Sequence, residues 1–159
     1  PCGYYGDSLK PCTCAHATVT KYQKRISGPL LDRIDIHIEV PRVDYEKLSG
    51  NRLSESSDAI RQRVQAARER QRIRFSNNGS SDIISNAEMR IGEIRQFCQL
   101  QAEGQSLMRS AMSQLQLSAR AYHRILKLSR TIADLAGSEE IQSAHLAEAL
   151  QYRPKIMIG

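Results

Sequence analysis

The most regular pattern in the chain is a helical repeat of apolar residues over its C-terminal half. Between residues 89 and 150 apolar side chains recur every three or four positions, the spacing that places them on one face of an α-helix. Gly137 is suited to end the third helix and Ser143 to begin the last, which Pro154 follows. We therefore predict a small bundle of four helices joined by short loops, whose apolar repeats are Met89, Ile91, Ile94, Phe97 and Cys98, then Leu107, Met108, Ala111, Met112 and Leu115, then Ile125, Leu128, Ile132 and Leu135, and finally Leu146, Ala149 and Leu150.

The first fifty residues have a less regular pattern. Residues 15–26 are compatible with a short helix, and residues 30–33 with one further turn. Residues 34–40 alternate strictly between apolar and polar side chains, which predicts a half-buried β-strand. Because one strand does not make a sheet, we expect its partners to lie outside this sequence or in segments that the pattern does not reveal.

A longer helix is predicted over residues 55–75, with Ile60, Val64 and Ala67 on one stripe. Its neighbouring face carries arginine, and residues 51–76 hold seven Arg against three acidic residues, four of the six net positive charges. Such a cluster can meet an anion such as nucleic acid, or it can be a solvated face laced with salt bridges. The candidate nucleic-acid contacts are Arg63, Arg70 and Arg74.

Size and composition narrow the class of protein. With 159 residues the chain is one large domain or two small ones. Its core has few aromatic residues and no Trp, which favours helices built from Leu, Ile, Val and Ala. No apolar run approaches the roughly 18 residues of a membrane-spanning helix, and the start has no signal-peptide pattern. We therefore expect a cytoplasmic protein that does not enter the membrane.

Three of the four cysteines, Cys2, Cys12 and Cys14, lie in the first fourteen residues, whereas Cys98 stands alone. In a chain without secretory features, clustered cysteines favour metal over disulfides. Tetrahedral zinc takes four ligands, and His16 is a possible fourth. The alternative is that these cysteines serve as small apolar residues.

Several stretches together resemble the magnesium-chelatase-like AAA+ ATPases, and in particular their competence-associated ComM/YifB branch. The resemblance covers essentially the whole chain and is carried by PCGYYGD (1–7), GPLLDRID (28–35), ESS (55–57), ARERQ (67–71), LSARAYHRILK (117–127) and TIADLAG (131–137). It implies a mainly α chain, the C-terminal edge of an AAA+ α/β core followed by a helical lid bundle. The corresponding segments are residues 1–50 of the core, a basic connecting helix over 51–78, and the lid over 79–159.

The resemblance also implies roles for individual arginines. Arg33 resembles the arginine finger that is supplied to the ATP of a neighbouring subunit, and Arg120 resembles the sensor-2 residue of the lid, with Arg124 as its nearest competitor. The alternatives are that Arg33 pairs with a neighbouring carboxylate and that Arg120 is merely solvated. The Gly-rich phosphate-binding loop is absent from these residues, so the chain should not hydrolyse ATP by itself.

The function that follows is the C-terminal part of an ATP- and Mg²⁺-dependent hexameric motor that acts on DNA, with neighbouring subunits as partners and Zn²⁺ as a possible further cofactor. The alternative is a non-enzymatic helical module that binds nucleic acid or a protein partner through its arginine-rich helix. Metal insertion is a third and weaker idea, because nothing in these residues resembles a porphyrin site.

Overall fold

The computed structural model describes residues 1–7, 9–31, 33–40, 43, 55–77 and 82–153. These residues are mainly helical and contain no β-strand. They belong to two compact units, the first comprising Pro1–Leu53 with Pro154–Gly159 and the second Ser54–Arg153. Within the described parts, no helix has the length and apolar character needed to cross a bilayer.

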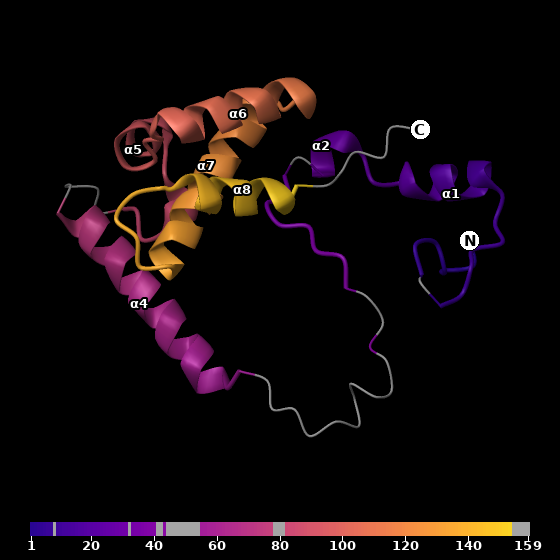
Figure 1. Cartoon of the computed structure of the whole chain (residues 1–159), viewed down its shortest axis with the longest axis horizontal. Coiled ribbons are helices and arrows are strands. Elements are labelled where there is room, and N and C mark those ends of the chain that lie inside the picture. Colours follow the sequence, from indigo (N-terminus) through magenta and orange to yellow (C-terminus); the bar gives the residue numbers. More distant parts are fainter. Residues whose placement is uncertain (8, 32, 41–42, 44–54, 78–81, 154–159) are drawn as a thin grey trace. The chain divides into compact units, whose positions relative to one another are not determined.

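The first unit begins with a loop that leads into α1 (His16–Gln23) and then α2 (Gly28–Leu31) (Figure 1). Helix α1 confirms the prediction from sequence, although it ends three residues earlier than the predicted helix. Helix α2 begins and ends two residues before the turn that was predicted over residues 30–33. Pro29 lies in the first turn of α2, where its missing N–H costs nothing. Val19 is the buried apolar residue among the described residues of this unit.

The predicted strand over residues 34–40 is wrong for this chain. These residues are described, and they form no strand and no bridge. The period-two pattern is present, but a strand is defined by hydrogen bonds to a neighbour, and the described residues supply none. The alternation therefore leaves apolar side chains such as Ile38 and Val40 largely exposed.

The second unit contains the helix bundle that the apolar repeat predicts. It begins with α4 (Ser57–Ser76), followed by the short 3₁₀ turn η1 (Asn86–Glu88) and the helix α5 (Ile91–Phe97). The chain then forms α6 (Ala102–Gln114), α7 (Ala119–Leu135) and α8 (Ser143–Gln151). Gly137 ends α7 with a φ of 76°, the left-handed conformation that favours glycine after a helix.

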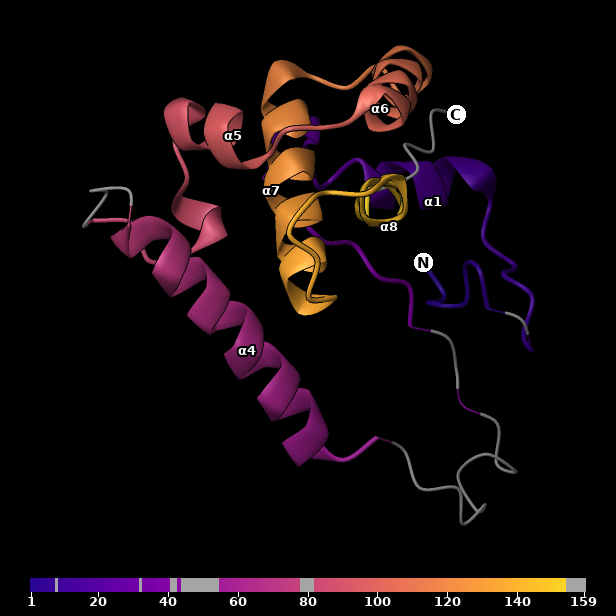
Figure 2. The ribbon, with the colours of Figure 1, turned by 60° about the vertical axis from the view of Figure 1, so that its left-hand side comes forward.

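Helix α7 lies in the middle of this unit, with α8 crossing it and α5 beside it, while α6 packs against α8 (Figures 1 and 2). The side chains that it buries include Ile125 and Ala133, and α8 contributes Leu146 and Ala149. The core of the unit therefore forms where these two helices cross, and the other helices close it from the sides.

Helix α4 packs against α7 only through its C-terminal half. Ala67, Gln71 and Phe75 are buried, and the ring of Phe75 meets that of Phe97 edge to face with 5.8 Å between centroids. Ile60 and Val64, predicted on the same stripe as Ala67, are 42% and 37% exposed. The stripe thus continues beyond the packed contact onto a part of the helix that leads away from the bundle (Figure 2).

Candidate functional site

The loop before α1 is shaped by local hydrogen bonds. Gly6 has a φ of 83°, and the Asp7 N–H bonds to the Tyr4 carbonyl at 3.2 Å. The Asp7 carboxylate then accepts bonds from the backbone N–H groups of Leu9 and Lys10 at 2.9 and 3.0 Å. Asp side chains stabilise turns in this way. The chain therefore reverses direction here and returns towards its first residues.

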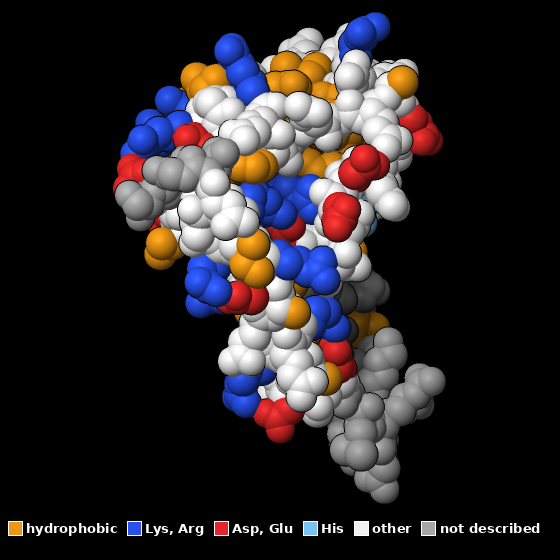
Figure 3. Space-filling model, turned by 90° about the vertical axis from the view of Figure 1, so that its left-hand side faces the viewer, with side chains coloured by type: hydrophobic (Ala, Val, Ile, Leu, Met, Phe, Trp, Pro, Cys, Tyr) orange, Lys and Arg blue, Asp and Glu red, His pale blue; other side chains and the backbone are white. Residues whose placement is uncertain are grey.

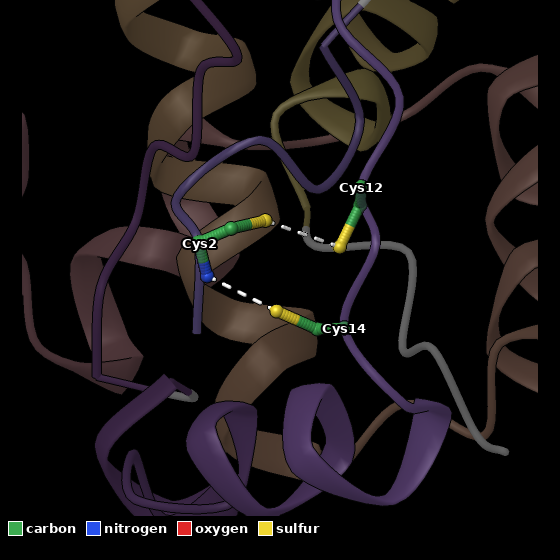
Figure 4. Close-up of side chains that lie close together, drawn as sticks. All are labelled: Cys2, Cys12 and Cys14. Carbon is green, nitrogen blue, oxygen red and sulfur yellow. Dashed lines mark hydrogen bonds between the residues drawn. The ribbon is translucent and has the colours of Figure 1, made fainter.

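This reversal brings Cys2, Cys12 and Cys14 together (Figure 4). Their sulfur atoms all lie within 4.8 Å of one another, and the Cys2 and Cys12 sulfurs are 3.4 Å apart. All three are free thiols, since a disulfide would need about 2.05 Å between sulfurs. The structure thus brings together the three cysteines that the sequence grouped as candidate metal ligands.

Backbone N–H groups point at two of the sulfurs. The Tyr4 N–H donates to the Cys2 sulfur at 3.4 Å, and the Cys2 N–H donates to the Cys14 sulfur at 3.1 Å. The bond from Tyr4, followed by that from Cys12, lowers the pKa of Cys2 to about 7. At Cys12 the backbone bond to Cys14 lowers the pKa, but the nearby Cys2 side chain and partial desolvation outweigh it and raise the value. Cys2 is therefore the thiol of the cluster that ionises first.

His16 does not join this cluster. Its Nδ1 atom lies 3.4 Å from the Thr20 hydroxyl oxygen, one turn along α1. Among the residues that the structure describes, the cysteines are the only group of three or more potential metal ligands in mutual reach. The fourth position expected from sequence is thus not filled by His16 in this conformation.

Arg33 follows α2 and is exposed. Its Nη1 group donates to the Pro29 carbonyl at 3.0 Å, which ties the guanidinium to the backbone of α2. Asp32, one of the carboxylates that could pair with it, lies outside the described residues.

Arg120 is exposed in the first turn of α7, two residues after the N-cap Ser118. The Ser118 hydroxyl accepts a bond from the Ala121 N–H at 3.2 Å. No acidic side chain lies in this first turn, so the positive end of the helix dipole and the guanidinium stand together. Arg124, one turn later, is half-buried.

The three candidate arginines of α4 have different surroundings. Arg63 makes a two-pronged ion pair with Glu55, at 2.7 and 3.2 Å. Arg70 is exposed, and its guanidinium lies close to Gly137 at the C-terminal end of α7. Arg74 is only 15% exposed and binds the Asp134 carboxylate with both terminal nitrogens, at 2.5 and 2.8 Å. Arg74 therefore serves the packing of the bundle.

Asp134 is the centre of a buried polar network that the sequence did not reveal. Besides Arg74, it accepts bonds from Arg130 Nε at 3.2 Å and from Asn86 Nδ2 at 2.8 Å. Arg130 also donates to the carbonyls of Ser138 and Glu139 at 2.6 and 2.7 Å. Burial lowers the pKa of Arg130, and the Asp134 carboxylate opposes that shift. The network joins α4, η1 and α7 through charges that are buried or nearly so.

One sequence signal could have pointed to this network. Arg130 and Asp134 are spaced four apart, and they lie on the same helix as the apolar repeat at Ile125 and Ile132. An acid and a base at i and i+4 on a core-facing helix predict a buried ion pair. Nothing in the sequence identifies Arg74 as their third partner, 60 residues away from Asp134.

Comparison with known proteins identifies the class to which this architecture belongs. Residues 54–153 match the family model "Magnesium chelatase, subunit ChlI C-terminal", and residues 1–48 match "Magnesium chelatase, subunit ChlI". The first match has the same bounds as the second structural unit. The chain belongs to the magnesium chelatase ChlI family.

Individual relatives are similar over most of this chain. It is 42% identical over 142 residues to the competence protein ComM of Haemophilus influenzae, which covers 88% of this chain and 26% of ComM. It is 40% identical over 154 residues to YifB of Escherichia coli, which covers 96% of this chain and 29% of YifB. A YifB protein of Salmonella typhimurium is 36% identical. The chain thus spans less than a third of the length of these curated relatives.

Proposed function

We propose that this chain is the C-terminal part of a magnesium-chelatase-like AAA+ ATPase, a hexameric motor that uses ATP and Mg²⁺ to act on DNA. The observation that carries the proposal is the ordered match of both chelatase models, 1–48 and then 54–153, to a chain in which Arg33 of the first part and Arg120 of the second are both exposed. The name of the Haemophilus relative, a competence protein, supports DNA as the substrate.

In this proposal Arg33 is the arginine finger. A finger stabilises the charge that develops on the γ-phosphate of a neighbouring subunit during phosphoryl transfer. It has to be exposed, and its stem has to be held. Arg33 is exposed, and the bond from its Nη1 group to the Pro29 carbonyl holds the side chain near α2, so both requirements are supported.

Arg120 is proposed as the residue that senses nucleotide from the lid. A cation in the first turn of a helix is disfavoured by about 0.3–1 kcal/mol, because the helix dipole is positive there. That cost becomes a gain when an anion such as a phosphate lies between the helix N-terminus and the guanidinium. Arg124, half-buried one turn further on, is the second candidate for this role.

This chain does not by itself fit a complete site for ATP and Mg²⁺. Its sequence contains no Gly-rich loop of the G-x-x-x-x-G-K-[ST] type that cradles phosphates. We propose that the remainder of the longer protein supplies it, so that the two arginines act on nucleotide held elsewhere. Zn²⁺ at the thiol cluster is a separate proposal with its own test.

The roles of the arginines are tested in the full-length protein. Arg33→Ala should keep nucleotide binding and lose ATP turnover, by on the order of 10³-fold in well-studied cases, because a finger acts in the transition state. Arg33→Lys should also lose most of the ATP turnover, since an ammonium group does not reproduce the forked hydrogen bonding of a guanidinium. The matched control is Arg109→Ala, which removes an exposed arginine of α6 and should leave turnover unchanged.

Mixed hexamers distinguish a finger from a structural arginine. Arg33→Ala subunits are combined with subunits that lack the phosphate-binding lysine. Each type can complete a site that the other lacks, so the mixture should hydrolyse ATP faster than either variant alone. If the mixture shows no activity above its components, Arg33 does not act across the subunit boundary.

A second candidate function is nucleic-acid binding through α4. Figure 3 shows a face on which Lys and Arg side chains gather, with Asp and Glu among them. Ion pairs such as Arg61–Asp58 and Arg72–Glu69 account for part of this mixture. The pattern favours a solvated face on which the charges are paired. Of the three candidate arginines, Arg70 is the one that is exposed and makes no ion pair with the described residues.

Binding of this chain to a fluorescent DNA duplex tests the second candidate. Phosphate contacts predict an affinity that falls steeply with salt, and Arg63→Gln with Arg70→Gln should weaken it and reduce the salt slope by about two. Arg95→Gln with Arg109→Gln is the control of equal charge on other helices. Equal loss in both double variants would show net attraction without a site on α4.

A further inference from the structure

We propose that Cys2, Cys12 and Cys14 bind one Zn²⁺ ion through three sulfur ligands, and that this ion fastens the N-terminal loop to the start of α1. The inference is independent of the ATPase proposal. It rests on the geometry of the thiols, on their exposure and on how little apolar surface the described residues of the first unit bury.

The sulfur positions suit a tetrahedral ion. Zinc–sulfur bonds of about 2.3 Å and tetrahedral angles place neighbouring sulfurs about 3.8 Å apart. The three sulfurs lie within 4.8 Å of one another, and the pair Cys2–Cys12 is at 3.4 Å. Shifts of less than 1 Å in the sulfurs, about the size of a small side-chain rotation, bring all three onto one ion.

The solvent exposure of these three cysteines differs from that of Cys98, which packs in the hydrophobic core. Cys98 is 4% exposed in the core of the second unit, as expected of a small apolar side chain. Cys2 is exposed, and Cys12 and Cys14 are half-buried, so apolar burial does not explain why the three lie together. A disulfide would pair two of the three thiols and leave the third without a partner.

The backbone around the sulfurs is arranged for thiolates. N–H groups of Tyr4 and Cys2 donate to the sulfurs of Cys2 and Cys14, the kind of outer contact that supports metal-bound sulfur.

The loop also needs a cross-link to hold it in place. Among the described residues of the first unit only Val19 is a buried apolar side chain, which leaves little hydrophobic burial to order residues 1–14. Small units without a core are held by disulfides or by a structural metal. Because Cys14 directly precedes Ala15, the N-cap of α1, an ion bound there would also fix where the helix begins.

The ligand set favours zinc over other metals. Thiolates are soft ligands that select zinc, Cu(I) and iron–sulfur clusters, and such clusters are usually held by four cysteines. Three thiolates leave one position of the tetrahedron for water or for a ligand outside the described residues. Mg²⁺, which the family name suggests as a metal, prefers oxygen ligands and does not suit this cluster.

Cobalt titration of the 159-residue chain tests the proposal. Co²⁺ replaces Zn²⁺ in such sites, and its visible absorption reports both thiolate ligation and tetrahedral geometry. The chain, reduced and freed of metal, should develop these bands until one Co²⁺ per chain is bound, and added Zn²⁺ should abolish them. Far-UV circular dichroism of the same samples shows whether the helices of the second unit stay folded.

Cysteine variants provide the decisive comparison. Cys12→Ser, Cys14→Ser and their combination should lose the thiolate bands while the helix signal stays unchanged. Cys98→Ala is the matched control and should keep them. Absence of the bands in the original chain, or equal bands in the double variant, would overturn the proposal. So would loss of the bands in Cys98→Ala with its helices intact, because the ligands would then include the wrong cysteine.

Discussion

At the scale of single residues, Asp134 receives hydrogen bonds from Arg74, Arg130 and Asn86 at a position closed to water. Taking charges out of water is costly, and only their mutual attraction and complete hydrogen bonding compensate it. The two guanidinium groups depend on one carboxylate, so that carboxylate is the part of the network that cannot be removed without leaving charge unpaired.

Asp134→Asn should therefore destabilise the second unit by about 3–5 kcal/mol, because it leaves two arginines in a buried site without their counter-ion. Urea unfolding followed by circular dichroism measures the change. Asp58→Asn is the control, since Asp58 pairs with Arg61 on the exposed surface of α4. That variant should change the free energy of unfolding by less than about 1 kcal/mol. Equal effects of the two variants would contradict the role assigned to Asp134.

The thiols provide a second prediction at this scale. Burial raises the pKa of Cys98 to about 12, whereas that of Cys2 is about 7. Only the thiolate reacts with alkylating reagents, so in the metal-free chain Cys2 should be modified half-maximally near pH 7 and Cys98 should stay unmodified at pH 8. Mass spectrometry of peptides after a short pulse of iodoacetamide measures both. Rapid labelling of Cys98 in the folded chain would show that its surroundings open to solvent.

At the scale of the elements, replacing two glycines by alanine should change the stability of the chain in opposite directions. Gly137→Ala should destabilise the chain by about 1–2 kcal/mol, because its φ of 76° is strained for alanine. The new methyl group would also lie 3.4 Å from the Arg70 guanidinium. Gly92→Ala, within α5 and with open space around it, should be neutral or stabilising by up to about 1 kcal/mol. Thermal unfolding of both variants tests the pair, and a shift of the same sign in both would contradict this account.

The helices were predictable because each one carries its own information. The apolar repeat places α5 to α8, and caps such as Ser118 and Gly137 mark where α7 begins and ends. The strand over residues 34–40 was not predictable in the same way. A period-two pattern describes one strand, but a strand forms only when a second segment pairs with it. Ile60 and Val64 show the same limit, since helical spacing predicts a face but not what covers it.

The candidate site was predictable only in part, for a similar reason. Spacing within fourteen residues was enough to group Cys2, Cys12 and Cys14, whose sulfurs the structure brings together. Spacing along the sequence was not enough to distinguish Arg74 from Arg70. The two arginines share a face of α4 and differ in the residues that pack against them. Arg74 meets Asp134, and no local pattern records a partner that is 60 positions away.

At the scale of the whole molecule, the hydrophobic core belongs to the second unit. Apart from Val19, the buried apolar residues among those described lie between Ala67 and Ala149. The core of α7 and α8, closed by α4, α5 and α6, is complete within residues that one family model also covers. Stability should therefore reside there, and the first unit should add little to it.

A shortened chain of residues 55–153 tests this division. It should fold cooperatively and unfold at the same urea concentration as the 159-residue chain, because all of the core side chains are retained. Circular dichroism at increasing urea measures both. In the longer chain, amide exchange should be slower within residues 119–150 than within residues 1–40. A lower midpoint for the shortened chain would show that residues of the first unit support the bundle.

The attachment of α4 at one end has a mechanical consequence. The helix packs against α7 from Ala67 onwards, and the Arg74–Asp134 ion pair strengthens that contact. Its first ten residues extend beyond that contact by about 15 Å, at a rise of 1.5 Å per residue. A tilt of about 10° at the fulcrum would then move the free end by roughly 2–3 Å, whereas the attached end would hardly shift. The same helix that closes the bundle is thus a lever arm, and the ion pair to Asp134 is one of the contacts that fix its attached end.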